Sequence, residues 1–251
     1  MILAAATLGE GPPVALLHGL FGQGRNFAGV QRALAVGRRV IALDLRNHGG
    51  SPHGQGMSYP AMAGDVLETL GGMGALPCAL VGHSMGGKVA MAAALLAPER
   101  VPRVLVADIA PAPSRSDFVS ILDGLRGLDL APGLTRRAAS AALAGAVPDG
   151  RVRDFLLQNF RAGAVPSWDF GLEGIAAGMG DILGWPEFTA PYAGPALFLR
   201  GARSDYVLPE HRPLIRALFP AARFATLKGA GHWLHADNPE GFTRVLQDFL
   251  A

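Results

Sequence analysis

The segment Cys78-Ala-Leu-Val-Gly-His-Ser-Met-Gly-Gly-Lys88 holds a G-x-S-x-G pattern centred on Ser84. The apolar run Cys78–Val81 in front of it has the length of a buried strand, and residues 85–97 behind it have helical spacing. A serine on such a strand-to-helix turn is exposed at the end of its strand, where the helix N-terminus favours a developing negative charge. The segment therefore predicts a nucleophile at Ser84.

The glycines of this region also resemble two nucleotide-binding motifs, but each match fails at a position that the chemistry requires. Gly82-x4-Gly87-Lys88 fits a P-loop except that Val89 stands where a Ser or Thr should bind Mg²⁺. The run Gly22-Gln-Gly-Arg-Asn-Phe27 resembles a dinucleotide fingerprint, but its third small residue is replaced by phenylalanine. We therefore expect neither a nucleotide site nor a dinucleotide cofactor.

Short apolar runs alternate with helical patterns on both sides of this turn. Runs of this length without polar alternation are typical of strands that helices cover on both faces, so we expect an α/β fold with a mostly parallel central sheet. The expected strands are Val14–Leu17, Arg39–Leu43, Cys78–Val81, Arg103–Ala107, Ala196–Leu199 and Arg223–Leu227, with Leu3–Ala6 as a short edge strand. The expected helices are Gly24–Val36, Tyr59–Leu70, Met85–Ala97, Glu210–Leu218 and Pro239–Leu250.

The alternation stops between residues 114 and 190, where apolar helical segments follow one another. We interpret this stretch as a helical cap inserted after the strand that ends at Asp108, with residues 1–113 and 191–251 forming the core. Ligands of open α/β sheets bind at the carboxyl ends of the strands, so a cap inserted there covers the binding edge. Helices are expected within it at Ser116–Leu125, Leu134–Leu143 and Arg151–Phe160.

Composition excludes several other classes of protein. Half of the 251 residues are hydrophobic, 17% are charged and the formal net charge is +2, so the chain can fold around a core and has no basic tract for nucleic acid. Its one cysteine, Cys78, cannot form an internal disulfide or a Cys-based zinc site, and we expect no metal. Without a basic leader or about 18 consecutive apolar residues, we expect a cytoplasmic protein that does not enter membranes.

A nucleophilic serine needs a general base, and His232 is the best placed histidine. It lies in the Gly-rich loop Lys228-Gly-Ala-Gly-His-Trp233, directly after the last expected strand. The other histidines that follow Ser84 are His211, which opens a helix, and His235, which follows a tryptophan. A histidine after the last strand can reach the serine across the carboxyl edge of the sheet.

The acid that orients this histidine has two candidates. Asp205 follows the penultimate strand, and Asp108 ends the strand after the elbow helix. Both are expected at the carboxyl edge of the sheet, and the residue pattern leaves the choice open. The oxyanion of a tetrahedral intermediate needs two backbone donors, for which we expect the N–H groups of Met85 and Leu20, with Phe21 as a wall of the substrate pocket.

With these residues identified, the chain resembles the YbfF-type esterases and abhydrolase domain-containing protein eleven, within the α/β-hydrolase superfamily. The resemblance runs from near residue 14 to the end of the chain. The matching stretches are His18–Gly22, Asp44–Pro52, Ser58–Tyr59, Gly82–Lys88, Asp108–Pro111, Trp185, Phe198–Gly201 and Gly229–Ala236.

This resemblance implies a serine esterase with a helical cap, no cofactor and activity on small acyl esters or thioesters. The nucleophile of the family falls on Ser84 and its base on His232, and Trp185 is expected in the substrate pocket. The relatives carry an acid at the position of Asp108 and lack one at that of Asp205, whereas this chain has both. The resemblance gives no role to Lys88.

Other functions on the same fold stay open at this point. A carbon–carbon bond hydrolase or an acyltransferase would keep the three catalytic side chains and change the pocket under the cap. A non-catalytic small-molecule binding protein is a further alternative, because fold does not fix function. Serine rather than aspartate at the elbow argues against dehalogenase or epoxide hydrolase chemistry. The acyl chain length and the choice between monomer and dimer are not readable from the residues.

Overall fold

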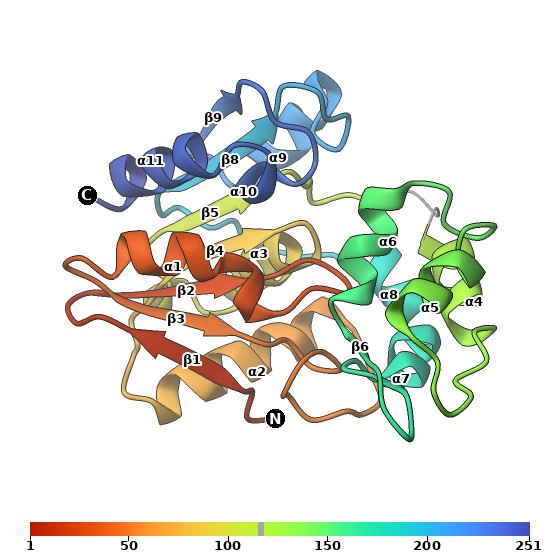
Figure 1. The fold of residues 1–251 in the computed structure, drawn as a ribbon. Coiled ribbons are helices and arrows are strands. Elements are labelled where there is room, and N and C mark those ends of the chain that lie inside the picture. The colour runs from red at the N-terminus through yellow and green to blue at the C-terminus, as the bar shows by residue number, and fades with distance from the viewer. Residues whose placement is uncertain (115–117) are drawn as a thin grey trace.

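The computed structural model describes residues 1–114 and 118–251, and within them a seven-stranded sheet forms the centre of the molecule (Figure 1). Its strand order is β1-β3-β2-β4-β5-β8-β9, with β1 antiparallel to β3 and every other neighbouring pair parallel. The expected α/β fold is thus confirmed, although the edge strand begins two residues later than expected. The strands are β1 Ala5–Leu8, β2 Pro13–Leu17, β3 Arg39–Leu43, β4 Ala79–His83, β5 Val104–Ala107, β8 Ala196–Gly201 and β9 Ala222–Leu227.

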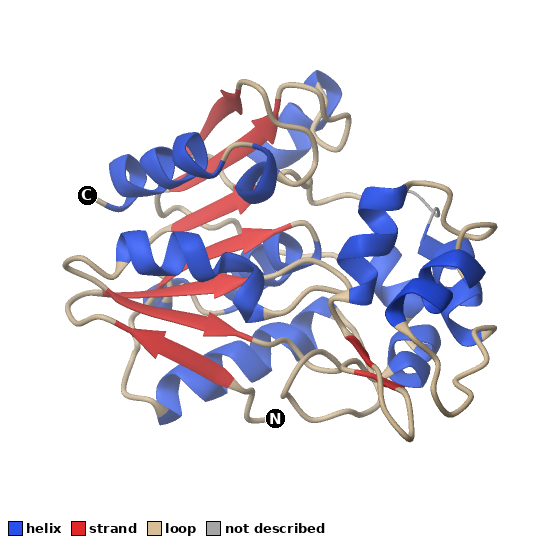
Figure 2. Ribbon diagram, in the orientation of Figure 1, coloured by secondary structure: helices blue, strands red, loops and turns tan. Residues whose placement is uncertain are grey.

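Helices cover both faces of this sheet (Figure 2). On one face α2 (Tyr59–Gly72) packs against α3 (Met85–Leu96), and on the other α1 (Ala28–Leu34) packs against α11 (Pro239–Leu250). Successive side chains of a strand point to opposite faces, so those of β2 alternate between two buried clusters. The remaining core helices are η1 Gly24–Phe27, η2 Pro98–Arg100, η3 Pro209–His211, α9 Arg212–Leu218 and α10 Leu234–Asp237. The helix expected over residues 24–36 is therefore a 3₁₀ turn followed by α1.

The segment between β5 and β8 forms a separate group of helices beyond the carboxyl ends of the strands, on the right in Figure 1. The first two residues of the expected helix Ser116–Leu125 lie outside the described residues, which leave out 115–117. The tyrosine hydroxyl of Tyr59 in the core donates to the carbonyl of Ile182 at 2.6 Å and ties the two parts together. The elements are α4 Phe118–Arg126, α5 Arg136–Ala142, α6 Gly150–Leu157, β6 Phe160–Arg161, β7 Ser167–Trp168, α7 Leu172–Ala177 and α8 Met179–Leu183.

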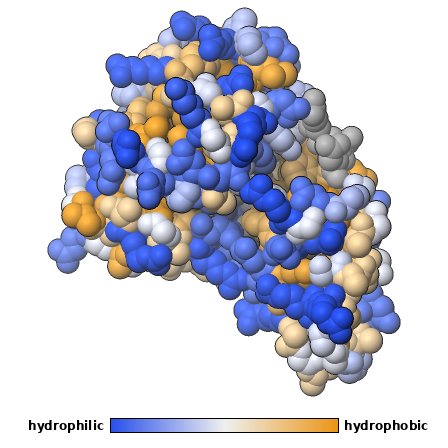
Figure 3. Space-filling view, turned by 45° about the horizontal axis from the view of Figure 1, so that its top comes forward, coloured by the Kyte–Doolittle hydropathy of each residue, from blue (hydrophilic) through white to orange (hydrophobic). Residues whose placement is uncertain are grey.

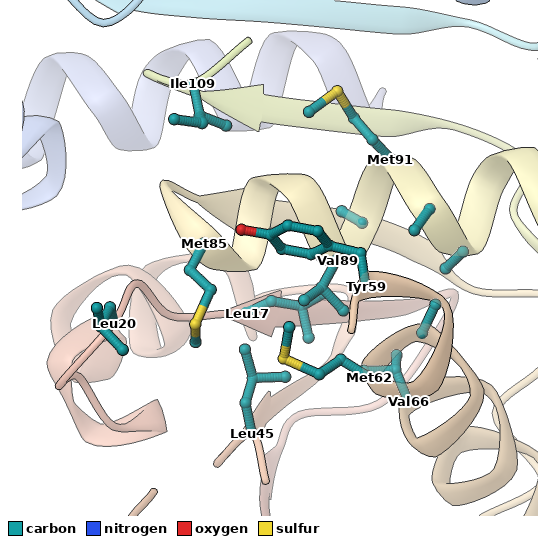
Figure 4. Close-up of a cluster of buried hydrophobic side chains, with 14 of the residues drawn as sticks. Leu17, Leu20, Leu45, Tyr59, Met62, Val66, Met85, Val89, Met91 and Ile109 are labelled. Carbon is teal, nitrogen blue, oxygen red and sulfur yellow. The ribbon is translucent and has the colours of Figure 1, made fainter. Parts of the chain in front are cut away.

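The surface and the larger buried cluster differ sharply in hydropathy. Hydrophilic residues cover most of the face shown in Figure 3, where the cap extends from the core at the lower right. Figure 4 shows part of the larger cluster, in which Leu20 and Met85 from the sheet edge lie near Leu45 and Tyr59. Among residues 1–114 and 118–251, no helix has the length and apolar character needed to cross a bilayer.

The turn between β4 and α3 is closed by two glycines whose backbones touch neighbouring backbone. A Cβ atom on Gly82 would lie 2.1 Å from the carbonyl oxygen of Gly86, and one on Gly86 would lie 2.3 Å from that of Leu17. Ser84 between them adopts a left-handed conformation with φ +53°. The G-x-S-x-G pattern therefore exists because this tight turn has no room for side chains two residues before or after the serine.

This close approach predicts the effect of Gly86→Ala. We expect the added methyl group to lower the free energy of unfolding by about 1–3 kcal/mol or more, because backbone rather than a movable side chain lies in its way. Gly29→Ala is the matched control, since a Cβ on Gly29 in α1 meets nothing within 4 Å and should stabilise the helix by about 0.5–1 kcal/mol. Denaturant unfolding checks both variants, and a Gly86→Ala protein as stable as the wild type would contradict the account.

Candidate active site

Three of the expected side chains meet at the carboxyl edge of the sheet. Ser84 follows β4, Asp108 follows β5 and His232 lies in the loop after β9. The Nε2 atom of His232 lies 3.1 Å from Ser84 Oγ, and its Nδ1 atom lies 2.8 Å from Asp108 Oδ2. The three residues thus form one hydrogen-bonded line from carboxylate through imidazole to hydroxyl, the geometry in which a histidine can take a proton from serine.

The carboxylate of Asp108 is buried and fully held by hydrogen bonds. Its Oδ1 accepts from the backbone N–H of Gly201 at 3.0 Å, and its Oδ2 accepts from the hydroxyl of Ser204 in addition to His232. Asp108 is 0% exposed and adopts a left-handed backbone with φ +55°. These contacts fix the carboxylate so that His232 donates through Nδ1 and accepts through Nε2. Ser204 was not among the expected residues, because nothing in its local sequence distinguishes it from a turn serine.

Two further contacts hold His232, one at its ring and one at its backbone. The ring of Tyr206 stacks on it at a centroid separation of 3.8 Å and an interplanar angle of 19°. The Nε2 atom of the neighbouring His83 lies 2.7 Å from the backbone carbonyl of His232, to which it donates. Because burial keeps the pKa of His83 well below its ordinary value, this ring stays neutral and the donation holds. The ring of His232 is thereby fixed in the orientation that faces Ser84.

Two expected positions lie elsewhere. Asp205 lines a separate cavity of about 160 Å³ with Ile109 and His211, while Nδ1 of His232 bonds to Asp108. Trp185, expected in the substrate pocket, packs instead inside the cap junction, with its ring 5.7 Å from that of Tyr59 and 5.2 Å from that of Phe188. Trp185 is thus not among the residues that line the cavity at Ser84, and the physical reason is that a large apolar ring gains as much by filling the core of the cap as by lining a pocket.

The two expected backbone donors lie beside Ser84. Met85 is the first residue of α3, so its N–H has no partner within the helix. A Cβ on Gly19 would lie 3.2 Å from Ser84 Cβ, which shows how closely the loop carrying Leu20 approaches the serine. The next amide along, that of Phe21, is already bonded to His48 Nε2 at 3.0 Å. Within the described residues the amides of Leu20 and Met85 make no hydrogen bond, so both can serve an incoming oxyanion.

Two buried histidines support this loop as neutral rings. His48 accepts the N–H of Phe21 at Nε2 and donates from Nδ1 to the carbonyl of Arg46 at 2.8 Å. His18 accepts the N–H of Leu45 at Nε2 and donates from Nδ1 to the carbonyl of Gly19 at 2.8 Å. Burial lowers the pKa of His18 to about 4 and that of His48 to about 3. Protonation would remove both acceptors, so the loop depends on the neutral state.

A cavity of about 480 Å³ opens above Ser84, between the core and the cap. Phe21 contributes to its wall, as expected, and its ring lies 5.4 Å from that of Phe170. Apolar side chains of the cap line the same cavity. Arg151, Arg203 and Asp237 also line it, and the carboxylate of Asp237 accepts a hydrogen bond from the guanidinium of Arg151 at 2.6 Å. The apolar cap residues that line the cavity are Phe118, Ile121, Val152, Phe155 and Leu156.

Lys88 lies one turn after Ser84 on α3 and is 0% exposed. Its ammonium group donates to Ser114 Oγ and to the carbonyl of Gly184, both at 2.8 Å, and lies 5.3 Å from the ring centroid of Tyr59. Burial lowers the pKa of Lys88 to about 7. These contacts connect α3 to both ends of the cap, so Lys88 holds the core and the cap together.

In the part of the chain that the structure describes, no group of three or more His, Cys, Asp or Glu side chains converges in a way that could hold an ion. The arrangement brings together a serine hydroxyl, an imidazole, a carboxylate and two backbone N–H groups without a hydrogen-bond partner among the described residues.

Comparison with known proteins agrees with this fold. A family model described as alpha/beta hydrolase fold matches residues 12–239. The chain therefore belongs to the α/β-hydrolase fold family. Within that family it is similar to the sn-1-specific diacylglycerol lipase ABHD11 of Xenopus laevis, with 42% identity over 249 residues that cover 96% of this chain and 80% of the relative.

Two further relatives extend the comparison. Esterase YbfF of Escherichia coli (strain K12) is 36% identical over 241 residues, which cover 95% of this chain and 92% of the relative. The solved structure of a marine microorganism esterase superposes with a TM-score of 0.95 at 34% identity and covers 99% of both chains. The expected resemblance to YbfF-type esterases is confirmed, and so is the expected enzyme class, because these relatives are carboxylic ester hydrolases.

The buried histidines predict how stability depends on pH. The buried His18 and His48, and also the half-buried His235 with a pKa lowered to about 4, are neutral when folded but titrate near 6.5 when unfolded. Between those values the unfolded chain binds more protons, so the free energy of unfolding should fall as pH falls from about 6.5 towards 4. Each histidine contributes at most about 1.4 kcal/mol per pH unit to this slope.

Denaturant unfolding at a series of pH values tests this, with His235→Phe as the informative variant. Its ring lies among Phe27, His83 and Phe242, at 4.8, 5.0 and 6.2 Å, so phenylalanine keeps the aromatic packing and removes one titrating group. We expect a shallower acid slope for this variant than for the wild type. Identical slopes for the two proteins would show that His235 does not contribute to acid stability.

Proposed function

We propose that this protein is a serine carboxylesterase that forms an acyl-enzyme on Ser84. The observation that carries the proposal is the continuous hydrogen-bonded line from Asp108 through His232 to Ser84, at the floor of a cavity with apolar walls. The names of the similar proteins, an esterase and a diacylglycerol lipase, support acyl esters as the substrate class.

The reaction follows from the geometry. Ser84 Oγ attacks the ester carbonyl while Nε2 of His232 takes its proton, and the amides of Leu20 and Met85 hold the oxyanion. The imidazolium, paired with Asp108, then gives its proton to the leaving alcohol as the carbon–oxygen bond breaks. Water enters, loses a proton to His232 and attacks the acyl-enzyme, which releases the acid and restores Ser84. No redox change and no metal ion are needed.

The cavity indicates the kind of ester that fits. Its volume of about 480 Å³ lies within the range of sites for small organic ligands. Cap side chains such as Phe118, Phe155 and Leu156 offer apolar contact to an acyl or alkyl chain. The acidic and basic side chains that line the cavity are Asp149, Arg151, Arg203 and Asp237, and both arginines pair with Asp237. Because two carboxylates balance the two guanidinium groups, the mouth has no formal net charge from these residues, and we infer a preference for neutral esters with apolar chains.

A fluorophosphonate probe tests the nucleophile directly. We expect one covalent adduct per chain, on the peptide that contains Ser84, because only a serine with a working base and oxyanion donors reacts rapidly. Ser84→Ala should remove both labelling and ester hydrolysis while the thermal unfolding temperature stays near that of the wild type. Intact-protein mass and peptide sequencing provide the readout. An adduct on another serine, or full hydrolysis by Ser84→Ala, would contradict the proposal.

The two acids are separated by a matched pair of substitutions. Asp108→Asn leaves the shape of the site intact but allows the wrong tautomer of His232, so kcat should fall by up to about 10⁴-fold. Asp205→Asn changes a residue of the neighbouring cavity, and we expect kcat within about tenfold of the wild type. Steady-state hydrolysis of p-nitrophenyl acetate measures both. The reverse order of effects would transfer the role of the acid to Asp205.

A further inference from the structure

The turn that carries the donor Leu20 has an unfavourable conformation. Gly22 N–H donates to the carbonyl of Gly19 at 2.9 Å, which closes a four-residue turn with Leu20 and Phe21 in its centre. Phe21 is left-handed, with φ +60°. The third position of a turn with φ above zero is normally glycine or asparagine, and a bulky residue there favours a turn with the central peptide flipped. The observed conformation must therefore be held by its surroundings.

Two side chains hold the backbone of Phe21 from opposite sides. Its N–H donates to Nε2 of His48, a core residue, at 3.0 Å, and its carbonyl accepts from Nδ2 of Asn159 at 2.8 Å. Both partners are buried, with exposed fractions of 0% and 2%. A flip of either peptide of Phe21 would break one of these bonds inside the protein, where no water replaces it, so together they lock the turn.

Asn159 belongs to the cap and is itself fixed in position. It follows α6 by two residues, and its Oδ1 accepts from Nε2 of Gln23, just beyond the turn. This second bond sets the amide so that Nδ2 faces the carbonyl of Phe21. The ring of Phe21 also contacts Phe170 of the cap, whose backbone bridges to His48. The cap therefore contacts this turn at both the backbone and the side chain of Phe21.

From these contacts we propose that Asn159 is a positioning residue for ester hydrolysis: the docked cap, through this amide, holds the turn in which the N–H of Leu20 faces the oxyanion. The inference rests on the serine esterase function proposed above. It makes the cap part of the catalytic apparatus rather than only a wall of the pocket. An enzyme whose cap has moved away would retain Ser84, His232 and Asp108 but lose an ordered oxyanion donor.

The test compares Asn159→Ala and Asn159→Leu with a neighbouring control. Leucine refills the space of the amide but cannot donate, so a shared defect reports the lost hydrogen bond rather than a cavity. The control is Gln158→Ala, which removes a different bond between cap and core, from Asn26 Nδ2 to Gln158 Oε1 at 2.9 Å, and leaves Phe21 untouched. The measurements are kcat and KM for p-nitrophenyl acetate, and the inhibition constant of phenylboronic acid, whose tetrahedral serine adduct needs the oxyanion donors.

We expect both Asn159 variants to lose about 10–100-fold in kcat, part of the 10²–10³-fold that complete loss of one oxyanion donor costs. KM should stay within twofold of the wild-type value. The inhibition constant of phenylboronic acid should rise by the same factor by which kcat falls. Gln158→Ala should behave as the wild type. If the Asn159 variants fail to fold, Gln23→Ala, which leaves Asn159 in place but removes its second bond, should give a smaller loss in kcat at unchanged KM.

Three results would overturn the inference. A kcat within twofold of the wild type in both Asn159 variants would show that the amide does not position the turn. A rise in KM with kcat intact would show that Asn159 shapes only the substrate pocket. A wild-type protein that neither hydrolyses esters nor binds the boronic acid would overturn the proposed function itself, and the Asn159 inference with it.

Discussion

The close backbone contact at the end of β4 is the constraint on which the site depends. Gly82 and Gly86 let the chain turn from strand to helix within a few residues, so that Ser84 stands at the carboxyl edge with the N-terminus of α3 directly behind it. Because the neighbouring strands are parallel, the residues after β5 and β9 reach the same edge. Asp108 and His232 therefore need no long side chains to complete the line to Ser84.

Several residues of the site have a backbone conformation that is unfavourable for their residue type. Among the described residues, the non-glycine positions with positive φ are Phe21, Asn47, Ser84 and Asp108, and all four belong to the site or to the loops that support it. Such conformations persist only where the surroundings hold them. Asp108 is held by its three hydrogen-bond donors, and Asn47 by bonds of its amide to Gly54 and by the cap through the N–H of Gly171. Strain and support are thus distributed between core and cap.

Much of this could be predicted from the sequence, because the decisive signals are local. The glycines around Ser84 and the Gly-rich loop of His232 adjoin their strands in the sequence, so the pattern alone places them at the sheet edge. The choice between Asp108 and Asp205 is different, since both follow adjacent strands and only the three-dimensional path of the His232 loop separates them. The role of Asn159 could not be predicted from the sequence, because its partner Phe21 is 138 positions away in the chain and no motif surrounds Asn159.

The structure of a covalent phosphonate adduct tests the central claim most directly, because its phosphoryl oxygen occupies the position of the oxyanion. We predict that the phosphorus is bonded to Ser84 Oγ and that this oxygen lies about 2.7–3.1 Å from the backbone nitrogens of both Leu20 and Met85, with the Asn159 bond to Phe21 intact. An adduct on Ser84 whose oxygen faces solvent or a side chain, with both amides unbound, would contradict the account.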